Sequence, residues 1–444
     1  MKQSKFNVGK KYNEKSYWVY NTLTTALVIL DEDQYLTYFV NEDFLVDGKD
    51  FTDLCEMGFF IEDEFDELQY LEELRKTVVK SNKKIADIMI APTMDCNAHC
   101  YYCFERGCHH EKMSIETADA VVEYIKNNWN HELFNITWFG GEPLLAPDII
   151  DYISEKMRQE GINFISRITT NGYELTPEIV RRAIEQWNTN KIQISIDALF
   201  EEYDKVKRYN LNQDGRAFKK VIQNVKTTLD EGVKVRVRIN FNPQEQYKAA
   251  ALMEYLQKEF SEYPHFESYF APIDVDSEIV PCIAGTFDDM SEHPFLSLIK
   301  FAQKYGYYDG NARGEKGNFL YDEHGLLVSL KMYPSPTNCY ASCPSVFAID
   351  SKGDLYKCHR VLGKGTDYSS GNVKTGVIRN DIYNFFCNTD LSYEECNECK
   401  LLPICQGGCK INAYIYKDDH ACSPIKAILP EVIEMYLEKE SREN

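Results

Sequence analysis

Three cysteines close together in the sequence have the type and spacing to do chemistry. Cys96, Cys100 and Cys103 lie within eight residues, directly after an apolar segment typical of a strand. A loop this short can fold three thiolates around one iron–sulfur cubane, but it supplies no fourth ligand without a distant partner. One iron would then stay open to a ligand from outside the protein, so the spacing predicts a reactive cluster rather than a structural one.

A second group of cysteines lies near the C-terminus. Its spacing is Cys-x2-Cys-x5-Cys-x3-Cys with one further cysteine after a gap, and its members are Cys396, Cys399, Cys405, Cys409 and Cys422. Upstream, Cys343 and Cys358 flank Gly353, and Cys339 precedes them. A Cys-x2-Cys pair also occurs in zinc ribbons, so the spacing alone leaves zinc open as an alternative to iron–sulfur clusters.

The composition excludes several classes of function. The chain has 444 residues, 15 cysteines and a formal net charge of −21, so we expect no nucleic-acid binding, which requires a basic face. No apolar run approaches the length of a membrane span, and the sequence does not start like a targeting signal. We therefore expect no membrane association and a cytoplasmic location, where cysteines serve as metal ligands or buried thiols rather than disulfides.

Strand and helix patterns alternate between residues 85 and 330. Runs of β-branched and apolar residues predict strands at 85–92, 135–139, 164–170, 191–197, 233–241 and 265–273. Helical periodicity predicts helices at 114–129, 147–159, 177–186, 217–231 and 246–260. These repeats indicate an α/β fold in which a parallel sheet, covered by helices, curls into a partial barrel. Ligands of such folds bind at the carboxyl ends of the strands.

Polar residues and glycines stand at those strand ends. They are Gly140, Gly141 and Glu142 after the second strand, Thr170 and Asn171 at the third, Ser195 and Asp197 at the fourth, and Arg238 and Asn240 on the fifth. Glycines let backbone approach a ligand closely, and a carboxylate can accept a hydrogen bond from an ammonium group. Each of these residues alone is more often a cap or turn residue, so their shared position carries the prediction.

The Cys-x3-Cys-x2-Cys loop after the first strand resembles the signature of the radical S-adenosylmethionine (SAM) superfamily. The resemblance implies a [4Fe–4S] cluster on this loop, with SAM chelating the open iron and cleaved to a 5′-deoxyadenosyl radical. It further implies that the Gly140-Gly141-Glu142 element holds the SAM amino group and that Ser195 and Asp197 lie near its ribose and carboxylate. Thr170, Asn171 and Arg238 would be further SAM contacts, and Tyr101 would lie near the adenine.

The C-terminal cysteine pattern resembles the SPASM domain, which carries two auxiliary [4Fe–4S] clusters in peptide-modifying radical SAM enzymes. The resemblance implies a distal cluster on Cys396, Cys399, Cys405 and Cys422. It implies a proximal cluster on Cys343, Cys358 and Cys409 with Cys339 as fourth ligand, and it leaves open whether one iron stays free for a substrate thiolate. The remaining cysteines, Cys55, Cys108, Cys282 and Cys387, are expected to be buried or inert, with Cys387 the strongest candidate for an additional ligand.

The segment before the barrel resembles the winged-helix-like unit that binds the leader in maturases of ribosomally made peptides. It contains an apolar strand, short helices and a longer helix at 64–79, and its acidic stretch from Asp31 to Glu73 would suit a basic leader. A structural cap on the barrel is the alternative. The predicted units are 1–84 for precursor recognition, 85–331 for a partial (β/α)6 radical SAM barrel, and 332–444 for a SPASM domain ending in a helix at 424–438.

Together these resemblances predict a radical SAM oxidoreductase that modifies a precursor peptide, preferably by joining a cysteine sulfur to a carbon in a thioether. The alternatives are an anaerobic sulfatase-maturating (formylglycine-forming) enzyme, a carbon–carbon crosslinking maturase, and a zinc-binding or electron-transfer protein without radical chemistry. The expected cofactors are three [4Fe–4S] clusters and SAM. The expected partners are the precursor peptide with its leader and an electron donor of the flavodoxin or ferredoxin type. The sequence identifies no catalytic proton acceptor.

Overall fold

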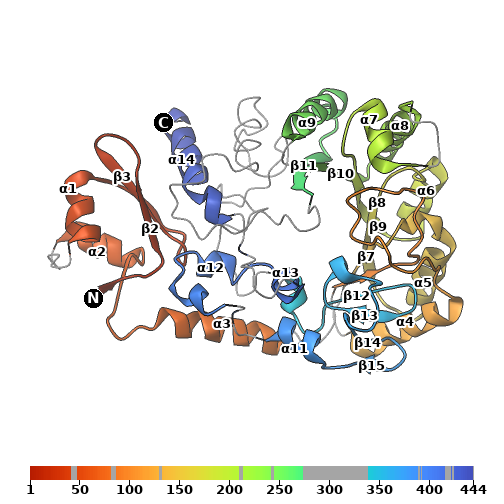
Figure 1. Cartoon of the computed structure of the whole chain (residues 1–444), viewed down its shortest axis with the longest axis horizontal. Helices are drawn as coiled ribbons and strands as arrows, with labels where there is room; N and C mark the ends of the chain where they lie inside the picture. Colours follow the sequence, from red (N-terminus) through yellow and green to blue (C-terminus); the bar gives the residue numbers. More distant parts are fainter. Residues whose placement is uncertain are drawn as a thin grey trace.

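A ten-stranded sheet forms the larger part of the fold. The computed structural model describes residues 1–41, 48–81, 87–129, 133–209, 214–241, 245–273, 339–388, 391, 393–415, 422 and 425–443. The strands are β6 (Asp87–Ile90), β7 (Phe134–Trp138), β8 (Phe164–Thr170), β9 (Thr189–Ser195), β10 (Lys234–Phe241), β11 (Phe266–Pro272), β12 (Phe347–Ile349), β13 (Asp354–Tyr356), β14 (Ser369–Asn372) and β15 (Gly376–Val377). Their order across the sheet is β11-β10-β9-β8-β7-β6-β12-β13-β14-β15, and the sheet lies on the right in Figure 1.

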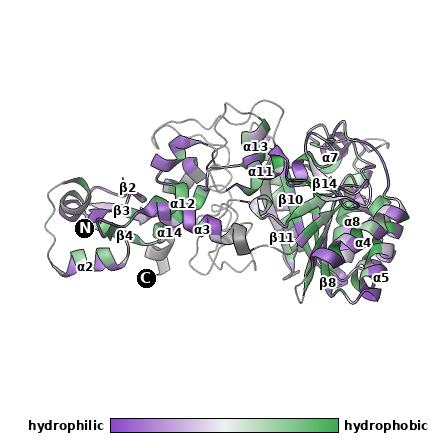
Figure 2. Ribbon diagram, turned by 90° about the horizontal axis from the view of Figure 1, so that it is seen from below, coloured by the Kyte–Doolittle hydropathy of each residue, from purple (hydrophilic) through white to green (hydrophobic). Residues whose placement is uncertain are grey.

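Strands β6 to β11 are parallel and form the predicted partial barrel. Most of the alternate side chains that face the helices are apolar and buried, as Ile88, Ile192 and Val235 are, and a buried side chain of this kind contributes about 1.5–3 kcal/mol by leaving water. Helices cover that face: α4 (Ile115–Asn128), α5 (Pro147–Gln159), α6 (Pro177–Glu185), α8 (Arg216–Asp230) and α9 (Gln246–Phe260). Their apolar sides turn toward the strands in Figure 2. The α/β fold and its strands and helices are thus confirmed, with ends shifted by at most two residues.

One helix of the barrel was not predicted. Helix α7 (Phe200–Lys207) follows β9 and packs beside α8. Five of its eight residues are charged and it ends at Arg208 in the left-handed conformation, with a φ of 53°. A helix this short and polar gives too weak an apolar periodicity to be recognised in the sequence.

The sheet continues into the C-terminal cysteine-rich region. Strand β12 pairs parallel to β6, and β13, β14 and β15 add antiparallel strands to it. All three residues of β12 are buried. The strands of this region are short, and they extend the barrel sheet rather than forming a separate layer. Three apolar residues in a row are too few for a sequence pattern to reveal the pairing.

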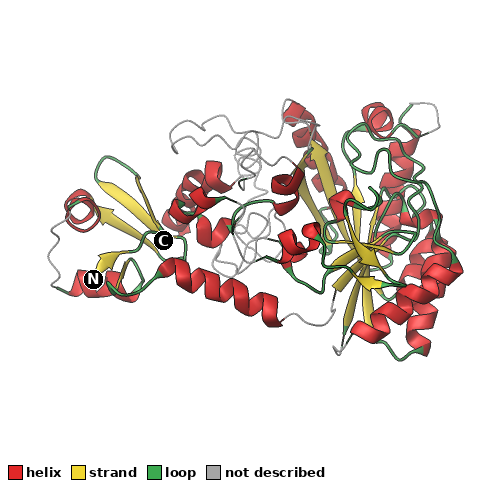
Figure 3. Ribbon diagram, turned by 60° about the horizontal axis from the view of Figure 1, so that its bottom comes forward, coloured by secondary structure: helices red, strands yellow, loops and turns green. Residues whose placement is uncertain are grey.

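The N-terminal unit forms the other end of the molecule (Figure 1). It has an antiparallel sheet of β2 (Asn7–Lys11), β3 (Ser16–Asn21) and β4 (Leu27–Asp31) and a short pair, β1 (Lys2–Gln3) with β5 (Phe60–Ile61). The turns α1 (Glu32–Tyr35) and η1 (Leu36–Val40) and the helix α2 (Lys49–Glu56) pack against these strands, and helix α3 (Glu67–Ser81) leads from this unit toward the barrel (Figure 3). The predicted long helix is therefore confirmed, although it begins and ends a few residues later.

The N-terminal unit contacts the C-terminal part of the chain. The ammonium of Lys10 lies 3.1 Å from Glu434 in the last helix, α14 (Ile425–Glu443), and Trp18 also donates to Glu434. The Thr22 hydroxyl donates to the Lys400 carbonyl at 2.5 Å. These contacts hold the first unit against the cysteine-rich region. None of the helices within the described residues is long and apolar enough to cross a membrane.

Candidate active site

The loop of Cys96, Cys100 and Cys103 follows β6 at the carboxyl end of the parallel sheet. The loop closes on itself, because Cys103 N donates to Cys100 O at 3.2 Å and Ala98 N donates to Cys96 Sγ at 3.4 Å. Burial raises the pKa of Cys96 to about 12, and Glu142 and the two other thiols raise it further. The three thiols are therefore close enough to influence one another. Without a cation they hold their protons, as expected of ligands whose protons a metal displaces.

Gly140 and Gly141 let the next strand end pack against the base of this loop. A Cβ on Gly140, whose φ is +106°, would lie 2.5 Å from Thr93 O, and a Cβ on Gly141 would lie 2.3 Å from Asp95 O. Real Cβ atoms do not come this close to backbone, so both positions need glycine. The sequence suggested that these glycines make room for a ligand. The structure shows that they make room for the chain's own backbone and so place Glu142 beside the cysteine loop.

Glu142 is fully buried and accepts three hydrogen bonds. Its donors are Leu144 N at 3.1 Å, Thr170 Oγ1 at 2.7 Å and Asn171 N at 2.8 Å. Burial raises the pKa of Glu142 to about 7, although these hydrogen bonds act to lower it. Asn171 in turn donates to Asn97 Oδ1 at 2.7 Å, within the cysteine loop. Glu142, Thr170 and Asn171, predicted from separate strand ends, thus form one network that can accept hydrogen bonds from an amino group.

A second network flanks the loop on its other side. Asp197 Oδ2 lies 2.7 Å from the Lys207 ammonium and accepts from the Tyr102 hydroxyl at 2.6 Å, while its Oδ1 accepts from Asn240 Nδ2 at 2.7 Å. Lys207 also donates to Ser195 Oγ at 3.0 Å. Burial alone would lower the pKa of Lys207, but Asp197, Tyr102 and Cys100 raise it well above its usual value. The predicted Ser195 and Asp197 therefore meet through a buried lysine.

Lys207 and Tyr102 are the site residues that the sequence analysis did not identify. Lys207 ends helix α7, which was not predicted, so nothing in the sequence indicated that Lys207 belongs to the site. Tyr102 lies next to Cys103 and its hydroxyl reaches Asp197, whereas the predicted Tyr101 is half-buried, with its ring centroid 5.3 Å from that of Tyr102. Which of the two neighbouring tyrosines reaches Asp197 depends on the direction of the loop backbone, and that direction cannot be read from the sequence.

Arg238 joins the second network from β10. Its Nε donates to Asn240 Oδ1 at 2.8 Å, and Asn240 contacts Asp197 and the Tyr102 hydroxyl. The predicted contact residues therefore form two hydrogen-bonded groups, one on Glu142 and one on Asp197, with the cysteine loop between them. A ligand above the loop can meet an acidic acceptor on one side and an ion pair with hydroxyl groups on the other.

Four of the C-terminal cysteines line a single pocket. Cys396, Cys399, Cys405 and Cys422 surround a cavity of about 300 Å³ together with mostly apolar groups. Burial, together with the three other thiols and Glu395, raises the pKa of Cys396 to about 12. A cavity bordered by four cysteines whose thiols influence one another fits a cubane with four thiolate ligands. These are the residues predicted for the distal cluster.

The cysteines predicted for the proximal cluster also lie near one another. Burial raises the pKa of Cys358 to about 12, and Cys339 and Cys409 add to the increase. Lys357, beside Cys358 in the sequence, is fully buried and donates to the carbonyls of Cys343 at 2.6 Å and Val346 at 2.7 Å. A buried cation next to four thiols suits a cluster that carries negative charge.

No group of three or more Cys, His, Asp or Glu side chains in the described part of the chain is spaced to hold a single metal ion. Of the other cysteines, Cys108 is buried with Sγ 3.3 Å from Leu362 O, Cys55 is partly buried, and Cys282 lies outside the described residues. Cys387 interacts electrostatically with Lys357 and Cys343, so it borders the proximal group.

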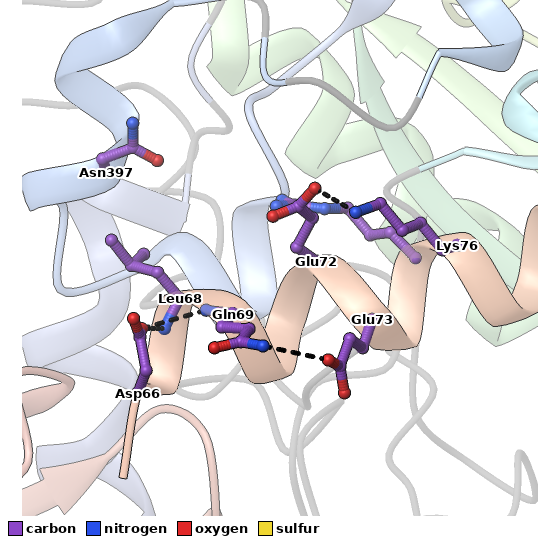
Figure 4. A pocket seen from close by; sticks show the side chains of 8 residues that line it. Asp66, Leu68, Gln69, Glu72, Glu73, Lys76 and Asn397 are labelled. Carbon is purple, nitrogen blue, oxygen red and sulfur yellow. Dashed lines mark hydrogen bonds and ion pairs between the residues drawn. The ribbon is translucent and has the colours of Figure 1, made fainter. Parts of the chain in front are cut away.

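A further pocket, of about 430 Å³, runs along α3 beside Asn397 (Figure 4). Its side chains pair among themselves: Gln69 donates to Glu73 at 3.2 Å, and Lys76 forms an ion pair with Glu72. Asp66 accepts from the amides of the first turn, as an N-terminal cap does. The pocket is polar and acidic, and it lies between the N-terminal unit and the distal cysteines.

Comparison with known proteins finds a family model that matches part of the chain and relatives of low identity. Residues 90–256 match the model of the radical SAM superfamily. The radical SAM cyclopropyl synthase TigE of Paramaledivibacter caminithermalis is 20% identical, over 93% of this chain and 89% of that protein. A probable GTP 3′,8-cyclase of Methanococcus maripaludis is 26% identical over 40% of this chain, which spans about half of that enzyme (56%).

Solved structures share the fold. The native anSMEcpe structure with bound AdoMet and the Cp18Cys peptide superposes with a TM-score of 0.58, at 18% identity over 79% of this chain and 98% of that one. Streptococcus suis SuiB bound to its precursor peptide SuiA superposes with a TM-score of 0.52, at 16% identity over 95% of this chain and 98% of that one.

Proposed function

Because residues 90–256 of this chain form a radical SAM domain, we propose that it is a peptide maturase that joins a cysteine sulfur of a precursor to a carbon in a thioether. The observation that carries the proposal is the pocket lined by Cys396, Cys399, Cys405 and Cys422. The cysteine loop alone would suffice to cleave SAM, so a second built cysteine site indicates chemistry that needs further clusters. The proposed units are 1–84 for precursor recognition, 85–331 for the barrel and 332–444 for the auxiliary clusters, although β12 belongs to the barrel sheet.

In this proposal, the cysteine loop holds one [4Fe–4S] cluster and the two C-terminal groups hold two more. When bound, the loop's cluster and SAM supply a 5′-deoxyadenosyl radical that removes a hydrogen atom, and the auxiliary clusters supply thiolate binding or an electron acceptor. Glu142, set in place by Gly140, Gly141, Thr170 and Asn171, accepts from the SAM amino group. The pair of Asp197 and Lys207, with Ser195 and Arg238, orients the ribose and carboxylate, and Tyr101 lies toward the adenine. An external flavodoxin- or ferredoxin-type protein would deliver the electrons.

A peptide substrate is supported by two observations. The anSMEcpe and SuiB structures that share this fold hold peptides. The N-terminal sheet also has two outer strands, β2 and β4, within the described residues, and an outer strand can pair with an extended leader. The acidic pocket along α3 (Figure 4) lies on a path from that sheet to the cysteine-rich region and suits a leader with Lys or Arg.

A carbon–carbon crosslink is the second candidate. It is favoured by the similarity to TigE, a cyclopropyl synthase, over 93% of this chain, since a cyclopropyl ring is built of carbon–carbon bonds. Formylglycine formation in a sulfatase is the third candidate. The three products leave different traces on the cysteines of a substrate, so one experiment separates them.

The test is anaerobic reconstitution of the full chain with iron and sulfide, followed by reaction with SAM, dithionite and precursor peptides encoded next to its gene. We expect 5′-deoxyadenosine, a precursor that is lighter by two hydrogens, and a cysteine that iodoacetamide no longer alkylates. Loss of two hydrogens with every cysteine still alkylated would replace the thioether by a carbon–carbon bond. Formylglycine in a sulfatase-motif peptide would favour the third candidate, and an absence of 5′-deoxyadenosine would refute the proposal as a whole.

A further inference from the structure

The inner face of the parallel sheet has a charge opposite to that of the whole chain. Strands β6 to β11 contain seven charged residues, and their pairing registers place all of them on the face turned away from the covering helices. These residues are Asp87, Arg167, Lys191, Lys234, Arg236, Arg238 and Glu267. Five are basic and two acidic, which gives a net charge of +3 in a chain whose formal net charge is −21. We call the five basic residues the basic inner face.

These cations are crowded. Arg167 is paired in register with Lys191, and Lys191 with Lys234, so three cations lie side by side on neighbouring strands about 4.8 Å apart. Like charges directly opposite each other destabilise a sheet. Burial, together with the nearby Arg236 and Lys234, lowers the pKa of Lys191 to about 8, although Glu267 acts to raise it. The arrangement costs stability in the free protein, and an anionic ligand would relieve that cost.

One buried carboxylate forms ion pairs with three of the five cations of the basic inner face. Glu267, 6% exposed, pairs with Lys234, with Lys191 at 3.5 Å and with Arg236 at 2.7 Å. Asp87 interacts electrostatically with Arg167. Within the described residues no carboxylate forms an ion pair with Arg238, whose Nε instead donates to Asn240. Among the described residues, the basic inner face therefore starts beside the Asp197 network and continues down β10 with more cations than carboxylates.

We infer that the basic inner face binds acidic side chains of the substrate peptide and thereby orients it below the SAM site; this inference rests on the proposed function. In the proposed SAM site the SAM carboxylate reaches only Arg238 of these five residues, and the sulfonium is itself a cation, so SAM leaves the other four cations without an anionic ligand. Lys234 and Arg236 stand two residues apart on β10, about 6.8 Å, which is also the spacing of alternate side chains in an extended peptide. Glu267 sits among the cations and would repel the concentrated charge of a triphosphate, so separate carboxylates fit better than a nucleotide.

The test compares two labelled peptides, Gly-Glu-Gly-Glu-Gly-Glu and its Gln counterpart, binding to the reconstituted full chain with SAM present. Fluorescence anisotropy should show the Glu peptide binding about tenfold more tightly at low salt. Lys234→Gln should reduce that ratio to about threefold or less, because the Lys234 side chain lies on the basic inner face and is 42% exposed, so a peptide can reach it. The matched control, Lys226→Gln on the exposed side of α8, should leave the ratio unchanged.

Glu267→Gln provides the opposite change. It removes the carboxylate that competes with the peptide for the same cations, so the Glu peptide should bind more tightly. If Lys234 and Glu267 had a purely structural role, Lys234→Gln and Glu267→Gln would both bind the Glu peptide more weakly. If the Glu267→Gln variant loses its iron or no longer unfolds cooperatively, the binding ratio of the Lys234→Gln variant alone tests the inference, because the Lys234 side chain is partly exposed. Equal binding of the two peptides by the unaltered chain would overturn the inference, as would tighter binding of GTP that Lys234→Gln abolishes.

These outcomes are separable from the test of the proposed function. A chain that modifies its precursor but does not distinguish the Glu from the Gln peptide would keep the maturase proposal and refute the basic inner face as a binding site. A chain that prefers the Glu peptide but forms no 5′-deoxyadenosine would support the acidic-ligand site and refute the maturase proposal.

Discussion

The Lys207 ammonium lies 2.7 Å from the Asp197 carboxylate, and neither side chain is more than 2% exposed. The pair connects three elements, because Lys207 ends α7, Asp197 follows β9, and the Lys207 carbonyl accepts from His99 N in the cysteine loop at 2.7 Å. A buried ion pair is retained at the cost of desolvating both charges. Its place beside the loop gives it a second role in the proposed function, since it holds the loop through His99 N and would present polar groups to SAM.

Replacing Lys207 by Met should therefore harm both stability and SAM binding. The change leaves Asp197 charged and buried without its cation, which typically costs about 3–5 kcal/mol. Urea unfolding of the metal-free protein measures this loss, and equilibrium dialysis with reconstituted protein measures SAM affinity. The control is Lys205→Met, which breaks an exposed pair with Glu202 on the same helix and should cost under about 1 kcal/mol. Similar unfolding midpoints for the two variants would contradict the role given to the pair.

The cysteine loop and a nearby buried cysteine allow a matched comparison. Cys100→Ala should remove the cluster's electron paramagnetic resonance signal and reduce 5′-deoxyadenosine formation to background, because only two loop ligands remain. Cys108→Ala should retain both, since the Cys108 thiol contacts the Leu362 carbonyl at 3.3 Å and belongs to the apolar packing. Cluster loss in the Cys108 variant would show that the ligand set is not the one proposed.

The distal pocket should be separable from SAM cleavage. Cys405→Ala is expected to lower the iron content from about twelve to about eight per chain, because one cubane loses a ligand. The modified precursor should disappear, while 5′-deoxyadenosine continues to form from SAM and dithionite. Iron analysis and mass spectrometry on one sample measure both effects. Full iron content in this variant would show that Cys405 is not a ligand.

The sequence predicted much of the barrel and less of the site. Strands such as 164–170 were found because apolar and β-branched residues recur along them. Glu142 was found because the Gly-Gly-Glu element follows a predicted strand, at the same end of the sheet as the cysteine loop. Lys207 was missed because its partner Asp197 is close only after α7 folds back. The pairing of β12 with β6 was missed because more than 250 residues separate them, and long-range pairing leaves little trace in a single sequence.

Glu142 should make the stability of the metal-free protein depend on pH. Burial raises its pKa to about 7 from an ordinary value of 4.5, so the folded chain keeps a proton that the unfolded chain releases. The stabilising contribution is then complete below about pH 4.5 and is lost as the pH rises through about 7, a change of about 3 kcal/mol. Glu142→Gln, which is always neutral, should flatten this part of the profile.

Denaturant unfolding between pH 5 and pH 8 measures the effect. Burial also raises the pKa of Glu105 to about 8. Its ionisation should therefore lower the free energy of unfolding a second time near pH 8, and this second decrease should persist in the Glu142→Gln variant. The exposed Glu178→Gln, in the first turn of α6, serves as the control and should reproduce the original profile. A profile for Glu142→Gln as steep as that of the unaltered chain would show that the proton is held elsewhere.

Lys357 should set the reduction potential of the proximal cluster. Its ammonium is buried, donates to the carbonyls of Cys343 and Val346, and lies 4.4 Å from the centre of the Phe347 ring. A buried cation favours the reduced, more negative state of a nearby cluster, so Lys357→Met should lower the potential. A loss of about 1.4 kcal/mol of electrostatic stabilisation corresponds to about 59 mV for one electron.

A redox titration followed by electron paramagnetic resonance separates the proximal signal from the others by its potential. The control is Lys364→Met, which removes an exposed lysine of the same region and should leave every potential unchanged. Iron analysis of the Lys357 variant distinguishes an electrostatic from a structural role, because the two carbonyl contacts also hold the loop of Cys343. A full complement of iron with an unchanged potential would mean that the Lys357 charge does not reach the cluster, and that the four thiols converge at a different place from the one assigned here.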